Sequence, residues 1–566
     1  MPPKLKGSIR RSQLVTTYGV GAIVPVGDEA LMVAAPERWD VSHPDLHEPR
    51  LERELRVTGF VQPPSSDDRP DVPVVRFPTW QSCPNCQRLA RHREFTHFDL
   101  NTCPDCTYTL VPSRFVIACE RGHIDDFPYD RWVHEGPRPD GGHRLEISST
   151  GATASLRGIV ISCSCGASRT MEHAFDRMAL ANVSTCQGRR PWKTFDGEPC
   201  DRMPRTLQRG ASSVWFAHTR SALSIPPWSE SASRALDGHW PTLRYVPVEA
   251  VGTIVEQMGL PAKTGFTKEE LLAIFAARKQ EEQGEATGEV SLRREEYEAL
   301  SRGRVETTKD VDFATRPGTV PTTLTPWIEQ LQIVTRLREV RALAGFSRIK
   351  PPQPGPGGNV VSLADETLGW LPAMEVKGEG LFLRLSEARL STWATSERVQ
   401  ARAVRIADEA RRRHDEWGTT LQRDVSPSFL LLHVLAHALI NQLSLDVGYP
   451  AGSLRERLYV EDGARGVLVY TATSDSAGSL GGLISQGNPD RFEGLVRDGV
   501  ERFAWCSADP VCIESDVRGS DALNLAACHS CALLPETSCD EMNRYLDRAL
   551  LVGTPSEPEI GFFHGI

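Results

Sequence analysis

The pattern of apolar and polar residues divides this chain of 566 residues into regions of different character. Residues 1 to 80 contain short apolar runs broken by turn residues, as in TTYGVGAIVPVG, which predicts strands joined by tight glycine turns. From 81 to 265 the chain is rich in Cys, His, Pro and Gly, which is typical of short β-hairpins held by metal. We therefore expect a β-rich region on the N-terminal side.

Helical spacing of apolar residues begins further along the chain. The segment from Thr267 to Gly303 places apolar residues at helix spacing among many charges and predicts an amphipathic helix with an acidic continuation. Residues 350 to 358, KPPQPGPGG, cannot sustain helix or strand and predict a linker at a boundary. Beyond it, EGLFLRL and VLVYTAT predict strands, Ser386 to Trp417 a long helix, and SPSFLLLHVLAHALINQLSL a buried helix capped by serine.

These segments predict an α+β multidomain protein, because a chain of this length is too long for one hydrophobic core. Its apolar content of 40% and charged content of 24% are those of a chain that folds. We expect a β-rich zinc-ribbon region, a helical middle and a C-terminal α/β zinc-binding domain. The expected boundaries give a docking segment at 1–80, a zinc-ribbon and knuckle region at 81–265, the helical middle at 266–349 and the C-terminal domain at 350–566.

The fourteen cysteines suggest metal binding rather than disulfides. The basic start, MPPKLKGSIRRSQ, is not followed by the apolar stretch of a secretion signal, and no window holds the roughly twenty uninterrupted apolar residues that cross a bilayer. We therefore expect a cytoplasmic protein with no membrane partner. Disulfides are uncommon in that compartment and clustered thiols more often bind metal, so the expected cofactor is Zn²⁺.

Two CxxC pairs carry the strongest metal signal. Cys83 and Cys86 form one pair, Cys103 and Cys106 form the other, and sixteen residues separate them. Four thiolates at this spacing can close a tetrahedron around Zn²⁺, which predicts a zinc ribbon. A closed four-thiolate site has no open position for a substrate, so this site indicates scaffolding or docking.

A second set of thiols follows with looser spacing. Cys163 and Cys165 are followed by Cys186 and Cys200 after intervals of twenty and thirteen residues, and we expect these four to hold one ion. Buried or unpaired thiols are the alternative. Cys119 and His123 could ligate metal with Asp125 or Asp126, but a Cys-x3-His pair lacks a convincing third ligand, and we interpret His123 as a filler beside the ribbon.

A third set lies near the C-terminus, where five cysteines occur within thirty-four residues. We expect Cys528, Cys531 and Cys539 to bind zinc with Cys512 as the fourth ligand, and Cys506 is the alternative fourth ligand.

Three further patterns resemble catalytic motifs. His433 and His437 have the spacing of a zinc-protease helix, but Val434 occupies the position of the general-base glutamate, so we interpret them as hydrogen-bonded histidines in a buried helix. Asp365 with Glu375-Val-Lys377 has the outline of a Mg²⁺-dependent nuclease site, a short pattern that also arises by chance. The chain has no G-x-x-x-x-G-K-[ST] loop, which excludes a nucleotide-driven motor of that type.

A net charge of −10 argues against nucleic-acid binding over the whole surface, so any contact with DNA is expected to be local. The segment from Gln187 to Arg220 carries seven basic and three acidic residues, with Trp192 and Trp215 available to stack on bases. A solvated basic surface around a zinc knuckle is an equally good reading. The candidate DNA-binding residues are Arg189, Arg190, Arg202, Arg205 and Arg209.

Several blocks of sequence resemble a known family. IRRSQLVTTYGVGAIVPVG, CERGHIDDFPYDRW and RGASSVWFAHTRSALSIP are similar to the DrmB family, a component of the bacterial DISARM anti-phage system, and the likeness spans most of the chain. The C-terminal blocks HVLAHALINQLSLDVGYPAGSLRERLY and CHSCALLPETSC resemble the zinc-binding domain at the end of MrfA-type DNA repair helicases. In that family the domain accompanies a superfamily 2 motor, either fused to it or on a separate chain.

The resemblance implies a non-motor subunit that forms a complex with a DrmA-like helicase and helps it to engage invading DNA. The lack of a nucleotide-binding loop and of a convincing catalytic constellation in the sequence predicts that the chain is not an enzyme. Two alternatives remain open on the residues alone: a metal-dependent nuclease built on Asp365, Glu375 and Lys377 or on Cys119 and His123, and a protein-interaction adaptor that never touches DNA.

Overall fold

The computed structural model describes residues 7–566 except 42, 65–70, 96–99, 138, 150–154, 194–196, 285–287, 306–310, 356, 420, 422, 462, 472–480 and 516–522. The chain forms two compact units, each assembled from separate stretches. The first unit comprises Met1–Pro44, Phe60–Arg220 and Ala342–Met374; the second comprises Asp45–Gly59, Ser221–Arg341 and Glu375–Ile566. The predicted α+β class is confirmed, since both strands and helices are abundant.

The chain passes between the units at points that composition does not mark. Four of the five crossings lie inside strands, which are β3 (Gly59–Val61), β14 (Phe216–Leu223), β16 (Ile328–Ser347) and β17 (Trp370–Leu385). These crossings therefore lie within regular β-structure, where no linker composition marks them. The boundaries expected at 80, 265 and 349 stay predictions. The segment 350–358 has no helix or strand among its described residues, as predicted.

Three small antiparallel sheets form most of the first unit. The first has the order β1 (Ile23–Val26), β2 (Glu29–Val33), β4 (Val74–Arg76). The second has the order β12 (Ser168–Thr170), β11 (Ile159–Cys163), β10 (Leu145–Ser149), β6 (Arg88–Arg91), β5 (Trp80–Ser82), β7 (Val111–Pro112). The third has the order β13 (Arg205–Gln208), β8 (Phe115–Ala118), β9 (Ile124–Asp126).

Short helices and an aromatic core complete the first unit. The helices are α1 (Gln13–Thr16), α3 (His92–Phe95) and α4 (Tyr129–Val133), and β3 (Gly59–Val61) lies at the start of one stretch. In the core, the rings of Trp80 and Tyr129 are 5.3 Å apart and those of Phe127 and Trp132 are 5.6 Å apart. The hairpins are short, and metal clusters are expected to add to the stability that this core provides.

Most of one larger sheet and most of the helices belong to the second unit, and β3 joins this sheet by pairing with β17. The sheet has the order β14, β16, β17, β19 (Gly466–Thr471), β18 (Leu454–Tyr459), and β15 (Phe313–Gly318) pairs with β16. The predicted strand VLVYTAT is β19 as far as Thr471, and its last two residues lie outside the described residues. EGLFLRL forms the end of the longer strand β17.

A helical group precedes the sheet strand β15 in the sequence. It consists of α2 (Pro49–Leu55), α5 (Ser231–Asp237), α6 (Trp240–Leu243), α7 (Val248–Gln257), α8 (Leu260–Thr264), α9 (Lys268–Gln283) and α10 (Gly288–Arg302). Thr267 opens α9 with a capping box, in which its hydroxyl oxygen accepts a hydrogen bond from the Glu270 amide at 3.2 Å. The segment Thr267–Gly303 is therefore two helices rather than one with a frayed end.

The remaining helices surround α13 (Pro427–Asp446). They are α11 (Glu387–Ala394), α12 (Glu397–Trp417), α14 (Gly482–Ser485), α15 (Pro489–Phe503) and α16 (Ala549–Val552). The long helix predicted for Ser386 to Trp417 is interrupted at Thr395 and Ser396. Ser396 then begins α12 as its N-cap residue, a position that serine favours.

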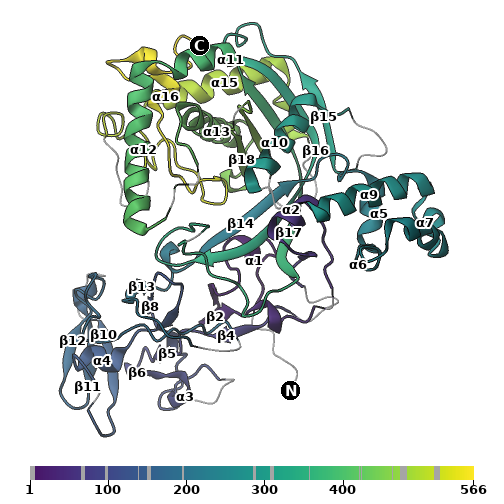
Figure 1. Ribbon diagram of the computed structural model, residues 1–566. Helices are drawn as coiled ribbons and strands as arrows, with labels where there is room; N and C mark the ends of the chain where they lie inside the picture. The colour runs from purple at the N-terminus through teal and green to yellow at the C-terminus, as the bar shows by residue number, and fades with distance from the viewer. Residues whose placement is uncertain are drawn as a thin grey trace. The chain divides into compact units, whose positions relative to one another are not determined.

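Helix α13 is the centre of the second unit, as Figure 1 shows by its place among α12, α15, α16 and β18. The predicted serine cap is confirmed, because the Ser426 hydroxyl oxygen accepts a hydrogen bond from the Phe429 amide at 3.3 Å. Among the described helices α13 alone is long and apolar enough to cross a membrane, and 83% of its apolar window is buried inside the protein. This is the burial expected of a core helix.

Candidate metal centres

The first candidate centre contains the two CxxC pairs. The Cys83 and Cys106 sulfurs are 3.2 Å apart, the Cys86 and Cys103 sulfurs are 3.8 Å apart, and all four lie within 4.8 Å of one another. Each pair forms a tight turn, in which the residue after the second cysteine, Gln87 or Thr107, has a φ near 60°. The structure thus brings together the four residues that the spacing predicts, in the arrangement of a closed zinc ribbon.

The second candidate centre is built from Cys119, His123, Cys186 and Cys200. His123 Nδ1 lies 3.3 Å from the Cys119 sulfur and 3.6 Å from the Cys186 sulfur. The other ring nitrogen of His123, Nε2, pairs with the Glu198 carboxylate at 2.7 Å. A carboxylate in this position fixes the ring and leaves Nδ1 for a metal, as at known metal-bound histidines.

The third candidate centre is built from His134, His143, Cys163 and Cys165. His134 Nε2 lies 3.4 Å from the Cys165 sulfur, and His143 Nδ1 lies 3.2 Å from the Cys163 sulfur. The second nitrogen of each ring faces a backbone carbonyl, at 2.6 Å for His134 and Asp130 and at 3.2 Å for His143 and Asp140. Both rings are therefore oriented with one nitrogen toward the thiols.

The grouping of Cys163, Cys165, Cys186 and Cys200 into one site was wrong. Cys163 and Cys165 lie at the β11–β12 turn, whereas Cys186 and Cys200 converge on the β8–β9 turn that carries Cys119 and His123. The prediction considered thiols alone and missed the histidines. Two histidines complete the site of Cys163 and Cys165, and Cys119 and His123 complete the site of Cys186 and Cys200. The reading of His123 as a filler is likewise corrected, since its ring lies between two cysteine sulfurs.

The fourth candidate centre lies in the second unit and contains Cys506, Cys512, Cys528 and Cys531. The Cys506 and Cys528 sulfurs are 3.5 Å apart, and those of Cys512 and Cys531 are 3.8 Å apart. The expected set had Cys539 in place of Cys506. This was wrong, because the Cys539 sulfur lies 3.1 Å from His433 Nε2 in a separate group.

The cysteine thiols of these centres differ in pKa. A hydrogen bond from Cys83 lowers the pKa of Cys106 to about 7, and the backbone amide of Ala167 lowers the pKa of Cys165 to about 6. A hydrogen bond from Cys186 lowers the pKa of Cys119 to about 4. Each centre of the first unit therefore contains one thiol that loses its proton at or below neutral pH, the form that binds metal.

The comparisons with known proteins agree with this geometry. Residues 435–532, which contain all four ligands of the fourth centre, match the family described as the MrfA Zn-binding domain, and residues 10–216 match a domain of unknown function (DUF8724). The chain is 30% identical over 564 residues to the DISARM protein DrmB of Bacillus paralicheniformis, covering 95% of this chain and 99% of that protein. The chain belongs to the DrmB family. For this DrmB-family protein, the name of the matched domain gives zinc as the metal.

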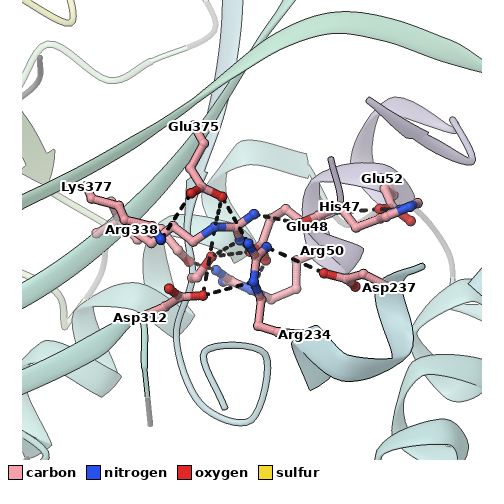
Figure 2. Close-up of polar contacts among 12 residues, drawn as sticks. His47, Glu48, Arg50, Glu52, Arg234, Asp237, Asp312, Arg338, Glu375 and Lys377 are labelled. Atoms are coloured by element: carbon pink, nitrogen blue, oxygen red, sulfur yellow. Dashed lines mark hydrogen bonds and ion pairs between the residues drawn. The ribbon is translucent and has the colours of Figure 1, made fainter. Parts of the chain in front are cut away.

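In this DrmB-family chain, the two carboxylates of the predicted nuclease pattern, Glu375 and Asp365, take part in separate ion pairs. Figure 2 shows Glu375 facing Arg338 and Arg234, at 2.7 Å and 3.1 Å, with Lys377 at 3.3 Å from the same carboxylate. Burial would raise the pKa of Glu375, but Arg338 lowers it to about 2. Asp365 pairs instead with Lys193 at 3.2 Å. Among the described residues, neither carboxylate belongs to a group of metal-donor atoms.

Glu375 belongs to a buried network of ion pairs around Arg338. Arg338, whose side chain is 1% exposed, also lies 3.5 Å from Glu48 and 3.8 Å from Asp312, and donates to the His47 carbonyl at 3.0 Å (Figure 2). A buried guanidinium needs such partners, because an unpaired charge in the interior is strongly destabilising. Glu375 therefore serves the packing of the second unit.

The basic segment offers fewer DNA contacts than its composition suggests. Arg190 is 17% exposed and pairs with Glu198 at 3.1 Å, while Arg209 is partly buried, which lowers its pKa. The Arg202 side chain is 56% exposed, and that of Arg205 is 37% exposed and lies 3.6 Å from Glu120. Arg189 is exposed. The segment 194–196 of this stretch lies outside the described residues.

The tryptophans of the basic segment do not face solvent. Trp192 is fully buried and packs edge-on against Phe346 with ring centroids 5.3 Å apart. Trp215 stacks on the same ring at 6.1 Å and donates from its indole nitrogen to the Val20 carbonyl at 3.0 Å. The suggestion that these rings stack on bases was wrong, since both belong to the core of the first unit.

Proposed function

We propose that this protein is the non-motor zinc-binding subunit of a DISARM defence complex, that it partners a DrmA-like superfamily 2 helicase, and that it helps the helicase to engage DNA in the cytoplasm. The observation that carries the proposal is the match to the MrfA Zn-binding domain over the fourth metal centre, within a chain of the DrmB family. MrfA-type proteins have such a domain beside a helicase motor.

The described metal centres support a scaffolding role rather than catalysis. Each offers four protein donor atoms within 4.8 Å of one another, and an ion with four protein ligands has no position for a substrate or an activated water. The sequence has no loop of the P-loop type for nucleotide phosphates. We therefore infer that ATP hydrolysis belongs to the partner.

Contact with DNA is inferred for the stretch around β13. Cys200, a ligand of the second centre, precedes Arg202 and Arg205 by only a few residues, so the metal would hold these exposed side chains in place. Two phosphate contacts give a dependence of log K on log salt with a slope of roughly −1.8. We therefore expect weak binding that salt readily abolishes.

Co-expression of this chain with the helicase of the same defence system tests the partnership. We expect the two chains to elute together from a size-exclusion column at physiological salt, with metal bound. Separate elution of folded chains at micromolar concentration, with and without DNA, would refute the partnership.

Charge-neutral variants test the DNA contact. We expect Arg202→Gln with Arg205→Gln to weaken DNA binding and to flatten the salt dependence, because two phosphate contacts are lost. Arg157→Gln is the matched control, since its side chain is 80% exposed and lies in the same unit outside the basic segment. Equal affinity and equal salt dependence for the wild type and both variants would show that DNA does not bind at Arg202 and Arg205.

An adaptor that binds protein alone is the second candidate. Trp505 is 71% exposed and Val511 is 56% exposed, and each directly precedes a cysteine of the fourth centre. Exposed aromatic residues on a rigid support are common at interfaces between proteins. Loss of helicase binding in Trp505→Ala, combined with no measurable DNA binding by the wild type or the complex, would favour the adaptor.

A further inference from the structure

A fifth group of metal-donor atoms lies in the core of the second unit, apart from the four centres already described. It consists of His433, His437, Glu456 and Cys539, and one donor atom from each lies within 4.8 Å of the others. The histidines and Glu456 are fully buried and Cys539 is 4% exposed. Donor atoms held about 2.0–2.3 Å from a tetrahedral ion lie roughly 3.3–3.8 Å apart, which is the scale of this group.

Three separate segments supply these side chains. Helix α13 carries the two histidines one turn apart, so both lie on the same face of the helix. Strand β18 carries Glu456, and Cys539 comes from the segment between the fourth centre and α16. His433 Nε2 lies 3.1 Å from the Cys539 sulfur and 3.2 Å from Glu456 Oε1.

The ring of His437 is oriented as in a metal-bound histidine. Its Nδ1 lies 2.6 Å from the Ala532 carbonyl oxygen, which can only accept, so Nδ1 carries the proton. In the neutral ring Nε2 then presents a lone pair, and it faces Glu456 Oε2 at 3.6 Å. Neither of these two atoms has a hydrogen-bond partner among the described residues. A lone pair facing a carboxylate oxygen in the interior is unfavourable unless a proton or a metal ion lies between them.

Cys539 and Glu456 are also supported from behind. The Cys539 sulfur accepts hydrogen bonds from the amides of Glu541 at 3.3 Å and Asn543 at 3.2 Å. Glu456 Oε1 accepts one from the Asp540 amide at 3.0 Å. Amide donors of this kind stabilise a thiolate and a carboxylate and hold them in position, as the outer ligand sphere of a metal site does.

We propose that His433, His437, Glu456 and Cys539 bind a fifth metal ion, a divalent cation of the zinc class. Two neutral imidazoles, one carboxylate and one thiolate carry two negative charges, so a divalent ion makes the buried set neutral. The mixed nitrogen, oxygen and sulfur donors suit zinc, and hard cations such as Mg²⁺ prefer oxygen alone. Both histidines are buried in α13 and have hydrogen-bond partners, as the sequence analysis predicted, and the proposal adds a metal ion to them.

The proposed ion is structural. It has four protein ligands and no exposed side, so it joins α13, β18 and the C-terminal segment in one cross-link within the second unit. The proposal does not depend on the partnership with a helicase or on DNA binding.

Anomalous X-ray scattering from crystals of the full-length protein, purified without chelator and measured on both sides of the zinc absorption edge, locates the ion directly. We expect a peak between His437 Nε2, Glu456 and the Cys539 sulfur, in addition to the peaks at the four other centres. Peaks at those four centres with none at this position would overturn the proposal.

Metal counting by native mass spectrometry adds an independent measurement. We expect Glu456→Gln to lose one ion per chain, because the amide is a poor ligand and lacks the charge. Glu379→Gln is the matched control, since Glu379 is a fully buried glutamate of the same sheet that accepts amide hydrogen bonds from Leu483 and is expected to keep every ion. A folded Glu456→Gln protein with the metal content of the wild type would refute the assignment. If this variant does not fold, the scattering experiment on the wild type decides.

Discussion

The assignment of ligands to the second and third centres leads to a sharp prediction about paired substitutions. Cys163→Ser and Cys186→Ser each remove one ligand, and the structure places these ligands on different ions. We expect each single variant to lose one ion per chain and the double variant to lose two. Cys163→Ser combined with His143→Ala removes two ligands of the same ion, so this pair is expected to lose only one.

The size of the effect follows from the number of ligands. A structural zinc ion binds with about 10–16 kcal/mol at pH 7, so one of four ligands contributes about 2.5–4 kcal/mol if they share it equally. That loss weakens binding by roughly two to three orders of magnitude. A chelator of intermediate affinity then removes the ion from the altered site and leaves the intact sites loaded.

Native mass spectrometry after incubation with such a chelator provides the assay, and Cys83→Ser gives a reference loss of one ion from the first centre. The sequence-based grouping makes the opposite forecast, because a single site of Cys163, Cys165, Cys186 and Cys200 loses one ion however many of its ligands are replaced. Loss of only one ion from Cys163→Ser with Cys186→Ser would refute the ligand sets described above.

Three further predictions concern a buried ion pair, a helix cap and a tight turn. Glu375→Gln should destabilise the second unit by about 3 kcal/mol at neutral pH, because the pKa of Glu375 is lowered to about 2 from 4.5. A carboxyl whose pKa is lowered in the folded state stabilises the protein above its unfolded pKa, so the difference in unfolding free energy between wild type and variant should shrink between about pH 4.5 and 2. Urea titrations measure this difference, and one that grows as the pH falls would contradict the prediction. Ser426→Ala should lower the free energy of unfolding by about 1 kcal/mol through loss of the α13 cap, with an unchanged value counting against the cap. Gly188→Ala should release the ion of the second centre, since a Cβ there would lie 1.7 Å from the Glu198 carbonyl oxygen at a φ of 67°, and full metal content would show that this turn can adapt.

Local patterns predicted the elements with strong signals. The serine before α13, the helical spacing that begins at Thr267 and the apolar run of β19 each depend on neighbouring residues, so the sequence indicated them directly. The break between α11 and α12 was missed because Ala, Arg and Glu dominate on both sides of it, although residues 391–396, STWATS, contain the serines and threonines that mark a new start.

The ligand sets depended on contacts that the sequence does not encode locally. The CxxC pairs of the first centre were found because each pair forms its own turn. Cys119 and Cys200 are eighty-one positions apart and come together only through the pairing of β13 with β8. The fifth group was missed for the same reason, since strand β18 and the chain beyond the fourth centre bring Glu456 and Cys539 to a helix whose two histidines have metal-site spacing but no further ligand nearby in the sequence.

The most direct test of the proposed function is DNA-stimulated ATP hydrolysis, measured for this chain alone, for its helicase alone and for the pair. The account predicts no hydrolysis by this chain, and a change in the DNA-stimulated rate of the helicase when the chain is present. An unchanged helicase rate with the chain in excess, or hydrolysis by the isolated chain, would contradict the view that it is the non-motor subunit of the complex.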